Sequence, residues 1–155
     1  MLQKMFFERN YKYGVLLYMI SKNDLANKNS KEQTLTVVVA DDDRDNLTFI
    51  SMILDALNLK YYLADNGKAA LDLIDEKQPD LVLLDIIMPI MNGIEVNIVI
   101  KADRTTSCIP TVAITGLAAS EHIRSIMNAG FDDYIVKPFM IEDLETKLKC
   151  LLKIS

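Results

Sequence analysis

Acidic, hydroxyl and amine side chains recur at four points of this sequence, each at the end of a short apolar run. The acidic run Asp41–Asp43 follows the first of these, and Asp85, Thr115 and Lys137 end or follow later ones. Carboxylates held together in a partly buried site repel one another, and a hard divalent cation relieves that repulsion. The residue types therefore suggest an oxygen-lined Mg²⁺ site with an amine and a hydroxyl beside it.

Such a set of groups could carry phosphoryl transfer. Mg²⁺, Lys137 and Thr115 can neutralise the charge on phosphoryl oxygens while a carboxylate acts as the nucleophile. Each residue alone has a simpler interpretation: the Asp41–Asp43 run as helix N-capping, Thr115 as a loop residue, Lys137 as a solvated charge and Tyr134 as core. The phosphoryl-transfer hypothesis depends on all of them meeting at the strand ends of one sheet.

Short apolar segments alternate with segments of helical periodicity from Leu35 onward. The expected strands are Leu35–Ala40, Lys60–Ala64, Asp80–Asp85, Thr111–Thr115 and Tyr134–Val136. The expected helices run from the capping residues Asp45–Asn46 to Leu57, around Ala70–Ile74 before Pro79, and over Ile94–Ala102, Ala119–Asn128 and Met140–Lys153.

The strand segments are continuously apolar, which is typical of a parallel sheet covered by helices on both faces. Right-handed crossovers then predict an α/β fold: a doubly wound, five-stranded parallel sheet with five helices, forming a flavodoxin-like three-layer α/β/α sandwich. Ligands of such sheets bind at the carboxyl ends of the strands. This domain is expected over residues 35–155. Residues 1–34, which include the polar stretch Ser21–Gln33, are expected to be a poorly ordered extension and linker.

Four segments resemble the receiver domain of bacterial two-component response regulators, and the resemblance covers about residues 35–153. The segments are VVVADDDRDN at 37–46, LVLLDIIMPIMNG at 81–93, IPTVAITG at 109–116 and AGFDDYIVKPF at 129–139. The resemblance implies a chemotaxis-regulator-like signalling switch that accepts a phosphoryl group from a histidine kinase or a histidine phosphotransfer protein. It implies no enzyme activity beyond Mg²⁺-dependent self-phosphorylation from a phosphodonor.

The family pattern also implies individual roles. Asp85 is the implied phosphoacceptor. The implied Mg²⁺ ligands are Asp41, Asp42, Asp85 and the backbone carbonyl of Ile87.

Thr115 and Lys137 are implied to contact the phosphoryl group, and the Lys137–Pro138 peptide is expected to be cis. Tyr134 occupies the position of the switch aromatic residue. On phosphorylation, Thr115 is expected to move inward and Tyr134 to fill the space, which reshapes the face built from the fourth helix, the fifth strand and the fifth helix. A downstream protein is expected to bind this face, which could also pair two copies as a homodimer.

The sequence departs from the family pattern at Ile87 and Leu117, two positions beside the phosphoryl site where polar side chains are common. Neither side chain can hold a water molecule by hydrogen bonding, so slow self-dephosphorylation is predicted. No effector domain follows the receiver region in this sequence, so a single-domain regulator with output through protein–protein contact is expected.

Composition excludes several other classes. Residues 1–34 hold six basic and three acidic side chains, whereas residues 35–155 hold eleven and nineteen, which argues against nucleic acid as the main partner. No apolar run is long enough to span a membrane, and a cytoplasmic location is expected. Cys108 and Cys150 match no zinc or redox motif and are expected to be reduced and partly buried, and His122 is expected on a helix surface.

Two alternatives belong to other functional classes. An aspartyl-phosphate phosphohydrolase of the haloacid dehalogenase type needs a second acid two residues after its nucleophile, where this sequence has Ile87. A receiver-like binding module that is never phosphorylated would not need the intact set of three aspartates, a threonine and a lysine. The sequence therefore favours the signalling switch.

Overall fold

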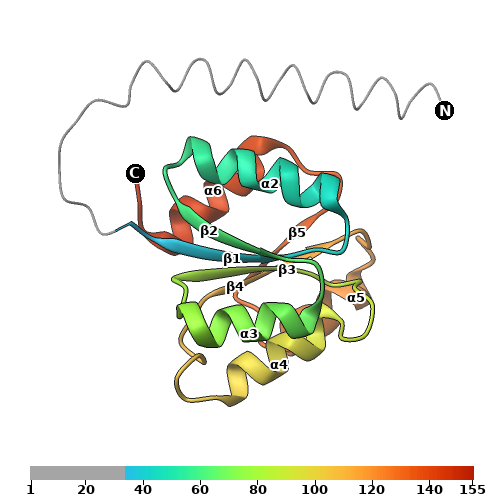
Figure 1. The fold of residues 1–155 in the computed structure, drawn as a ribbon. Helices are drawn as coiled ribbons and strands as arrows, with labels where there is room; N and C mark the ends of the chain where they lie inside the picture. The colour runs from blue at the N-terminus through green and yellow to red at the C-terminus, as the bar shows by residue number, and fades with distance from the viewer. Residues whose placement is uncertain (1–33) are drawn as a thin grey trace.

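The computed structural model describes residues 34–155, so the expected extension over residues 1–33 lies outside the described residues. Five strands alternate with five helices in this part of the chain (Figure 1). The elements are β1 (Thr36–Ala40), α2 (Arg44–Ala56), β2 (Lys60–Ala64), α3 (Gly67–Lys77), β3 (Leu81–Asp85), α4 (Gly93–Ala102), β4 (Thr111–Thr115), α5 (Ser120–Asn128), β5 (Asp133–Val136) and α6 (Ile141–Leu152). The predicted elements are therefore all present, with small differences at their ends.

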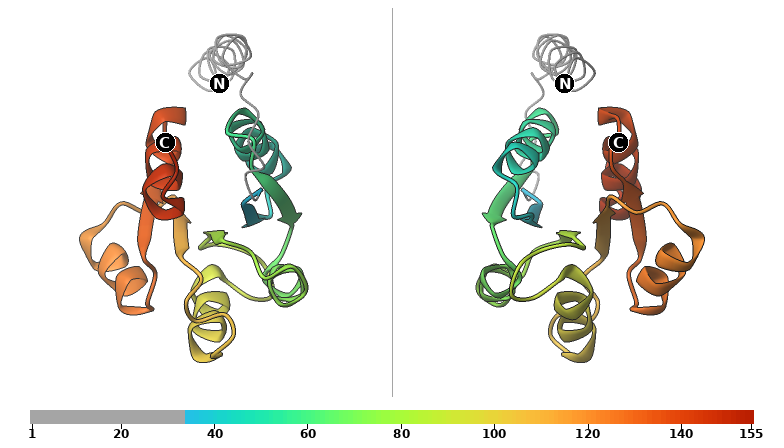
Figure 2. Two further views of the ribbon diagram at one scale, coloured as in Figure 1. Left: turned by 90° about the vertical axis from the view of Figure 1, so that its left-hand side faces the viewer. Right: turned by 90° about the vertical axis from the view of Figure 1, so that its right-hand side faces the viewer.

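The five strands form one parallel sheet in the order β2-β1-β3-β4-β5. Helices α2 and α6 cover one face, and α3, α4 and α5 cover the other (Figure 2). The predicted doubly wound three-layer fold is confirmed. The chain leaves β1 in one direction to reach β2 and then returns past β1 to β3, so the switch point lies between β1 and β3.

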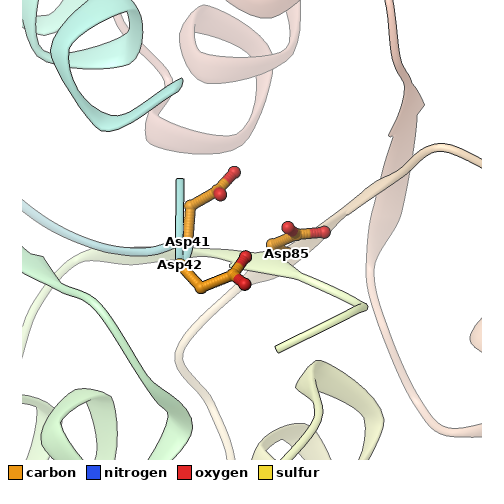
Figure 3. Close-up of side chains that lie close together, drawn as sticks. All are labelled: Asp41, Asp42 and Asp85. Carbon is orange, nitrogen blue, oxygen red and sulfur yellow. The ribbon is translucent and has the colours of Figure 1, made fainter. Parts of the chain in front are cut away.

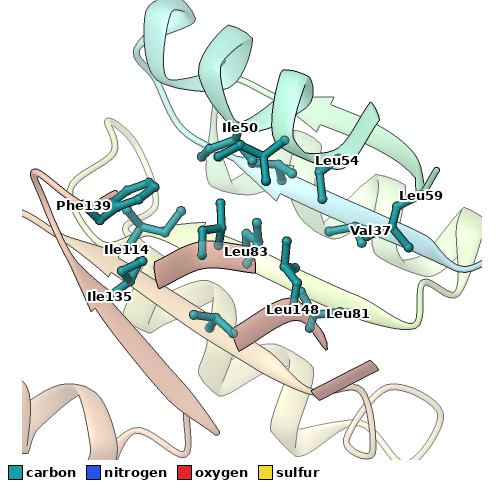
Figure 4. Close-up of a cluster of buried hydrophobic side chains, with 14 of the residues drawn as sticks. Val37, Ile50, Leu54, Leu59, Leu81, Leu83, Ile114, Ile135, Phe139 and Leu148 are labelled. Atoms are coloured by element: carbon teal, nitrogen blue, oxygen red, sulfur yellow. The ribbon is translucent and has the colours of Figure 1, made fainter. Parts of the chain in front are cut away.

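Alternate side chains of the central strands enter two separate cores, as the two-residue period of a strand requires. Val37, Val39, Leu81 and Leu83 point to the core under α2 and α6, part of which Figure 4 shows. The residues between them on β1 and β3 point to the core under α3, α4 and α5. Because both faces are apolar, β1, β3 and β4 are buried almost along their whole length.

Several details differ from the sequence-based expectations. Strand β2 is an edge strand and is mostly exposed or half-buried, so it is not continuously buried like the central strands. Cys108 and Cys150 are both exposed rather than partly buried. His122 is half-buried on α5, and its Nε2 atom is enclosed rather than facing solvent. None of the helices within residues 34–155 combines the length and the apolar character needed to cross a bilayer.

Candidate functional site

Three carboxylates meet at the switch point of the sheet. Each of Asp41, Asp42 and Asp85 places an oxygen within 4.8 Å of those of the other two (Figure 3). The parallel register explains the meeting: Ala40 lies beside Leu84, so Asp41, directly after β1, comes next to Asp85, the last residue of β3. Asp41 is fully buried, Asp85 is 6% exposed and Asp42 is exposed. The site is thus closed at its base and open on one side.

Lys137 joins two of these acids. Its Nζ lies 2.8 Å from Asp41 Oδ2 and 3.1 Å from Asp85 Oδ2. The residue directly follows β5, and its backbone N–H donates to the carbonyl of Thr115 at 2.7 Å. The peptide bond that it forms with Pro138 is cis, as expected. A single ammonium group therefore compensates two recessed carboxylates.

Burial and charge shift the acid–base balance of this cluster. Burial raises the pKa of Asp85, and the charge of Asp41 raises it further, while Lys137 opposes both effects. Burial works against the charged form of Lys137, but the hydrogen bond and charge of Asp41, followed by the charge of Asp85, raise its pKa overall. Lys137 thus stays protonated, and the carboxylates retain a mutual repulsion that a cation would relieve.

The other predicted site residues surround this cluster without touching the acids through their side chains. Thr115 is buried, and its Oγ1 accepts the backbone N–H of Leu117 at 3.1 Å. The N–H of Ile87 donates to Asp85 Oδ1 at 3.3 Å, while the Ile87 side chain is 61% exposed. Tyr134 is half-buried on β5, with Lys147 Nζ 5.8 Å from its ring centre.

One residue near the acids, Asn46, is not predicted from the sequence as part of the site. The sequence predicts a capping role for Asn46, with Asp45, but the N-cap of α2 is Asp43, whose side chain accepts the Asp45 N–H. Asn46 instead lies on the first turn of α2, and its Nδ2 donates to both oxygens of Asp41 at 3.3 and 3.1 Å. An amide residue five positions after a strand-end acid was the available signal.

Gly93 fixes the loop after β3, and its replacement by alanine should damage the site. A Cβ at this position would collide with the Asp85 carbonyl oxygen and lie 3.0 Å from the Asp85 carbonyl carbon, both of them backbone atoms. We expect Gly93→Ala to lower the free energy of unfolding by about 2–3 kcal/mol, as overpacking does. Gly116→Ala is the matched control, because nothing lies within 4 Å of its added Cβ. Urea unfolding of both variants checks this, and equal losses would contradict it.

Comparisons with known proteins identify the family of this chain. The profile of the response regulator receiver domain family matches residues 37–149. This chain belongs to that family. Among curated proteins, the receiver domain is 35% identical over 118 residues to the response regulator MprA of Mycolicibacterium vanbaalenii, and 33% identical over 117 residues to the DNA-binding response regulator MtrA of Mycobacterium tuberculosis. Both matches cover 76% of this chain but only 50% of the relative, so the chain spans about half the length of these relatives.

Solved structures show the same fold. A response regulator from Chloroflexus aurantiacus superposes with a TM-score of 0.75 at 23% identity, covering 78% of this chain and 99% of that one. The receiver domain of sensor histidine kinase PA1611 from Pseudomonas aeruginosa gives a TM-score of 0.73 at 24% identity, with 78% and 99% covered. That structure holds a magnesium ion in its active-site cleft. The family assignment makes this chain a phosphoacceptor-type signalling domain rather than a classical enzyme.

Proposed function

We propose that this receiver domain is a phospho-accepting switch of a two-component phosphorelay, phosphorylated on Asp85 by a histidine kinase or a histidine phosphotransfer protein. The observation that carries the proposal is the pairing of recessed Asp85 with Lys137 at 3.1 Å, beside two further aspartates. A nucleophilic carboxylate next to an ammonium group and a cation site is what phosphoryl transfer needs. The domain would work in the cytoplasm, where such kinases present their phosphohistidine.

The transfer itself needs little from the protein beyond position and charge. An Asp85 carboxylate oxygen forms the new bond to phosphorus as the P–N bond of the phosphohistidine breaks. The imidazole nitrogen leaves with the electron pair of that bond, as a neutral ring when the other ring nitrogen carries a proton. Lys137 then pairs with a phosphoryl oxygen, and Thr115 turns its hydroxyl toward another. Tyr134 moves into the space that Thr115 leaves.

The donor atoms of the site suit Mg²⁺. Asp42 is exposed and Asp85 is 6% exposed, and both carry carboxylate oxygens of the hard type that Mg²⁺ prefers. Asp41 completes the acid set, and the Ile87 carbonyl would be a further ligand. When bound, the cation would neutralise charge on the phosphoryl oxygens.

Mass spectrometry after incubation with acetyl phosphate and Mg²⁺ tests the assignment of Asp85. The wild-type protein should gain the mass of one phosphoryl group, and acetate leaves. Asp85→Asn removes the nucleophilic carboxylate and should gain none, while Asp43→Asn should remain competent, because Asp43 is the exposed cap of α2. Phosphorylation of the Asp85→Asn protein, or none in the wild type, would overturn the proposal.

For output we propose the face built from α5, β5 and α6. A groove of about 500 Å³ opens there, lined by residues 133–136 together with Phe139, Asp143, Thr146 and Lys147. Tyr134 belongs to this groove, so a change in its position would alter the surface offered to a downstream protein. The same face could pair two copies. The single-domain organisation and the role of residues 1–34 as a linker stay predictions.

Amide NMR with and without beryllofluoride, a phosphoryl mimic, tests the coupling between the phosphorylation site and the face built from α5, β5 and α6. Shifts should appear at the phosphorylation site and also across residues 119–145. The matched control is Tyr134→Ala, which should keep the site shifts and lose much of the distant response, because the moving side chain is gone. Wild-type shifts confined to the loop after β3 would refute the proposed output face.

A further inference from the structure

We propose that Asn46 is a positioning residue of the phosphorylation site: it holds the buried Asp41 carboxylate and keeps it hydrogen-bonded when Lys137 turns to the phosphoryl group. The inference rests on the proposed function, which gives Lys137 that second partner. Helix α2 would then contribute a side chain to the site, in addition to packing on the sheet.

The contacts around Asp41 show how firmly its carboxylate is held. Oδ1 accepts the Asp43 backbone N–H at 2.9 Å, and Oδ2 accepts Lys137 Nζ at 2.8 Å. Nδ2 of Asn46 donates to both oxygens, so each of them has two donors. The opposite orientation of the amide would turn its oxygen toward a carboxylate and repel it. These four contacts from protein donors fix the orientation of the Asp41 carboxylate beside those of Asp42 and Asp85.

The need for Asn46 follows from the way Lys137 is shared. Lys137 compensates Asp41 and Asp85 together, and a phosphoryl oxygen would compete with both carboxylates for the same ammonium group. Asp41 is fully buried, and a buried carboxylate that loses a donor is costly. Asn46 leaves a donor on Oδ2 after Lys137 has moved. The Asn46 amide therefore lowers the free-energy cost of moving the Lys137 ammonium group from Asp41 toward the phosphoryl oxygen.

A neutral amide suits this place better than a second cation. Arg or Lys at position 46 would hold Asp41, but its positive charge would repel a Mg²⁺ ion bound to the neighbouring carboxylates. An amide donates without adding charge. Its own position is fixed, because Asp43 caps the helix and Asn46 lies on the first turn directly behind that cap.

Mg²⁺ titration of the metal-free full chain, followed by calorimetry or by NMR, tests the role of Asn46. Removing a residue that orients a metal ligand weakens metal binding by about 10- to 100-fold, so Asn46→Leu should raise the Kd for Mg²⁺ at least about 10-fold. Asn46→Gln keeps the amide donor on a longer arm and should recover part of the affinity. The matched control Thr48→Leu, an exposed polar residue on the same helix, should bind Mg²⁺ like the wild type.

Two further readouts separate positioning from a general loss of structure. The ¹³C signal of the Asp41 carboxyl carbon in metal-free protein should move in Asn46→Leu and stay in Thr48→Leu. In urea unfolding, Asn46→Leu combined with Lys137→Met should lower the midpoint by more than the sum of the two single changes, since both donors serve one carboxylate. Unchanged Mg²⁺ affinity and an unmoved Asp41 signal in Asn46→Leu would overturn the inference. If Mg²⁺ binding responds as expected but the wild type takes no phosphate, the proposed function fails instead.

Discussion

Lys137→Met should lower the free energy of unfolding of the metal-free protein by about 3 kcal/mol, the low end of the range for breaking a buried ion pair. The low end applies because the Lys137 side chain is 24% exposed, while those of Asp41 and Asp85 are 0% and 8% exposed. Removing the ammonium group leaves two recessed carboxylates facing one another without a cation. Their repulsion in the folded state has no counterpart in the unfolded chain.

The loss should depend on pH in a definite direction. The pKa of Asp85 is already above its ordinary value of 3.8 because burial and Asp41 outweigh Lys137, and removing Lys137 raises it further. An acid whose folded-state pKa is raised keeps its proton in the folded chain after the unfolded chain has released it, so stability falls as pH rises from the ordinary aspartate range through the folded-state pKa. Lys137→Met should therefore lose more stability than the wild type over that interval.

Urea unfolding at several pH values, with and without Mg²⁺, measures both effects. Saturating Mg²⁺ should recover much of the loss, because a ligand that binds only the folded state stabilises it. Asp85→Asn provides a control of opposite sign: it removes one buried charge and its repulsion from Asp41, and the metal-free protein should become more stable. If Lys137→Met is as stable as the wild type, or Asp85→Asn is less stable, the electrostatic account of the site is wrong.

The opposite signs expected for these two variants reflect a site that trades stability for function. Three aspartates at one switch point repel one another in the absence of a divalent cation. The fold tolerates this repulsion because each face of the sheet packs against an apolar core. The cost is local and leaves the packing of the central strands untouched. A phosphoryl group and a divalent cation can then act on carboxylates that are already in place.

The meeting of Asp41, Asp85, Thr115 and Lys137 could be predicted from the sequence because parallel strands bring their carboxyl ends to one edge. Knowing which segments form the parallel strands was enough to place these residues at the same edge of the sheet. The exposure of β2 was not predicted, because an apolar segment does not reveal that its strand lies at the edge of the sheet.

The role of Asn46 was not predicted either, for a different physical reason. Asp43, Asp45 and Asn46 can all cap a helix, and the residue that does so depends on where the backbone leaves the extended conformation. A shift of the cap to Asp43 turns Asn46 back toward the end of β1. The donor to Asp41 therefore becomes visible only when the start of α2 is known.

Loss of the phosphoryl group should be slow in this protein and should accelerate in the double variant Ile87→Asn, Leu117→Glu. Hydrolysis needs a water molecule aligned opposite the Asp85–phosphorus bond, and a polar side chain beside that line can hold it. Ile87 and Leu117 have no hydrogen-bonding atoms in their side chains. At 61% and 48% exposure, both side chains project into solvent around the site, so Ile87 is not simply packed against its own loop.

Decay of phospho-Asp85 after removal of the phosphodonor, in the presence of Mg²⁺, measures the effect. Groups that orient or activate a reacting water contribute about 10²- to 10⁴-fold, so the double variant should lose its phosphoryl group at least about 100 times faster than the wild type. The control pair Ile98→Asn, Met127→Glu introduces the same polar groups at exposed apolar positions on α4 and α5, with exposures of 54% and 40%, and should decay at the wild-type rate. A double variant that decays no faster than this control would show that Ile87 and Leu117 do not set the lifetime. Faster decay would make these two apolar side chains the reason that the signal persists until a partner removes it.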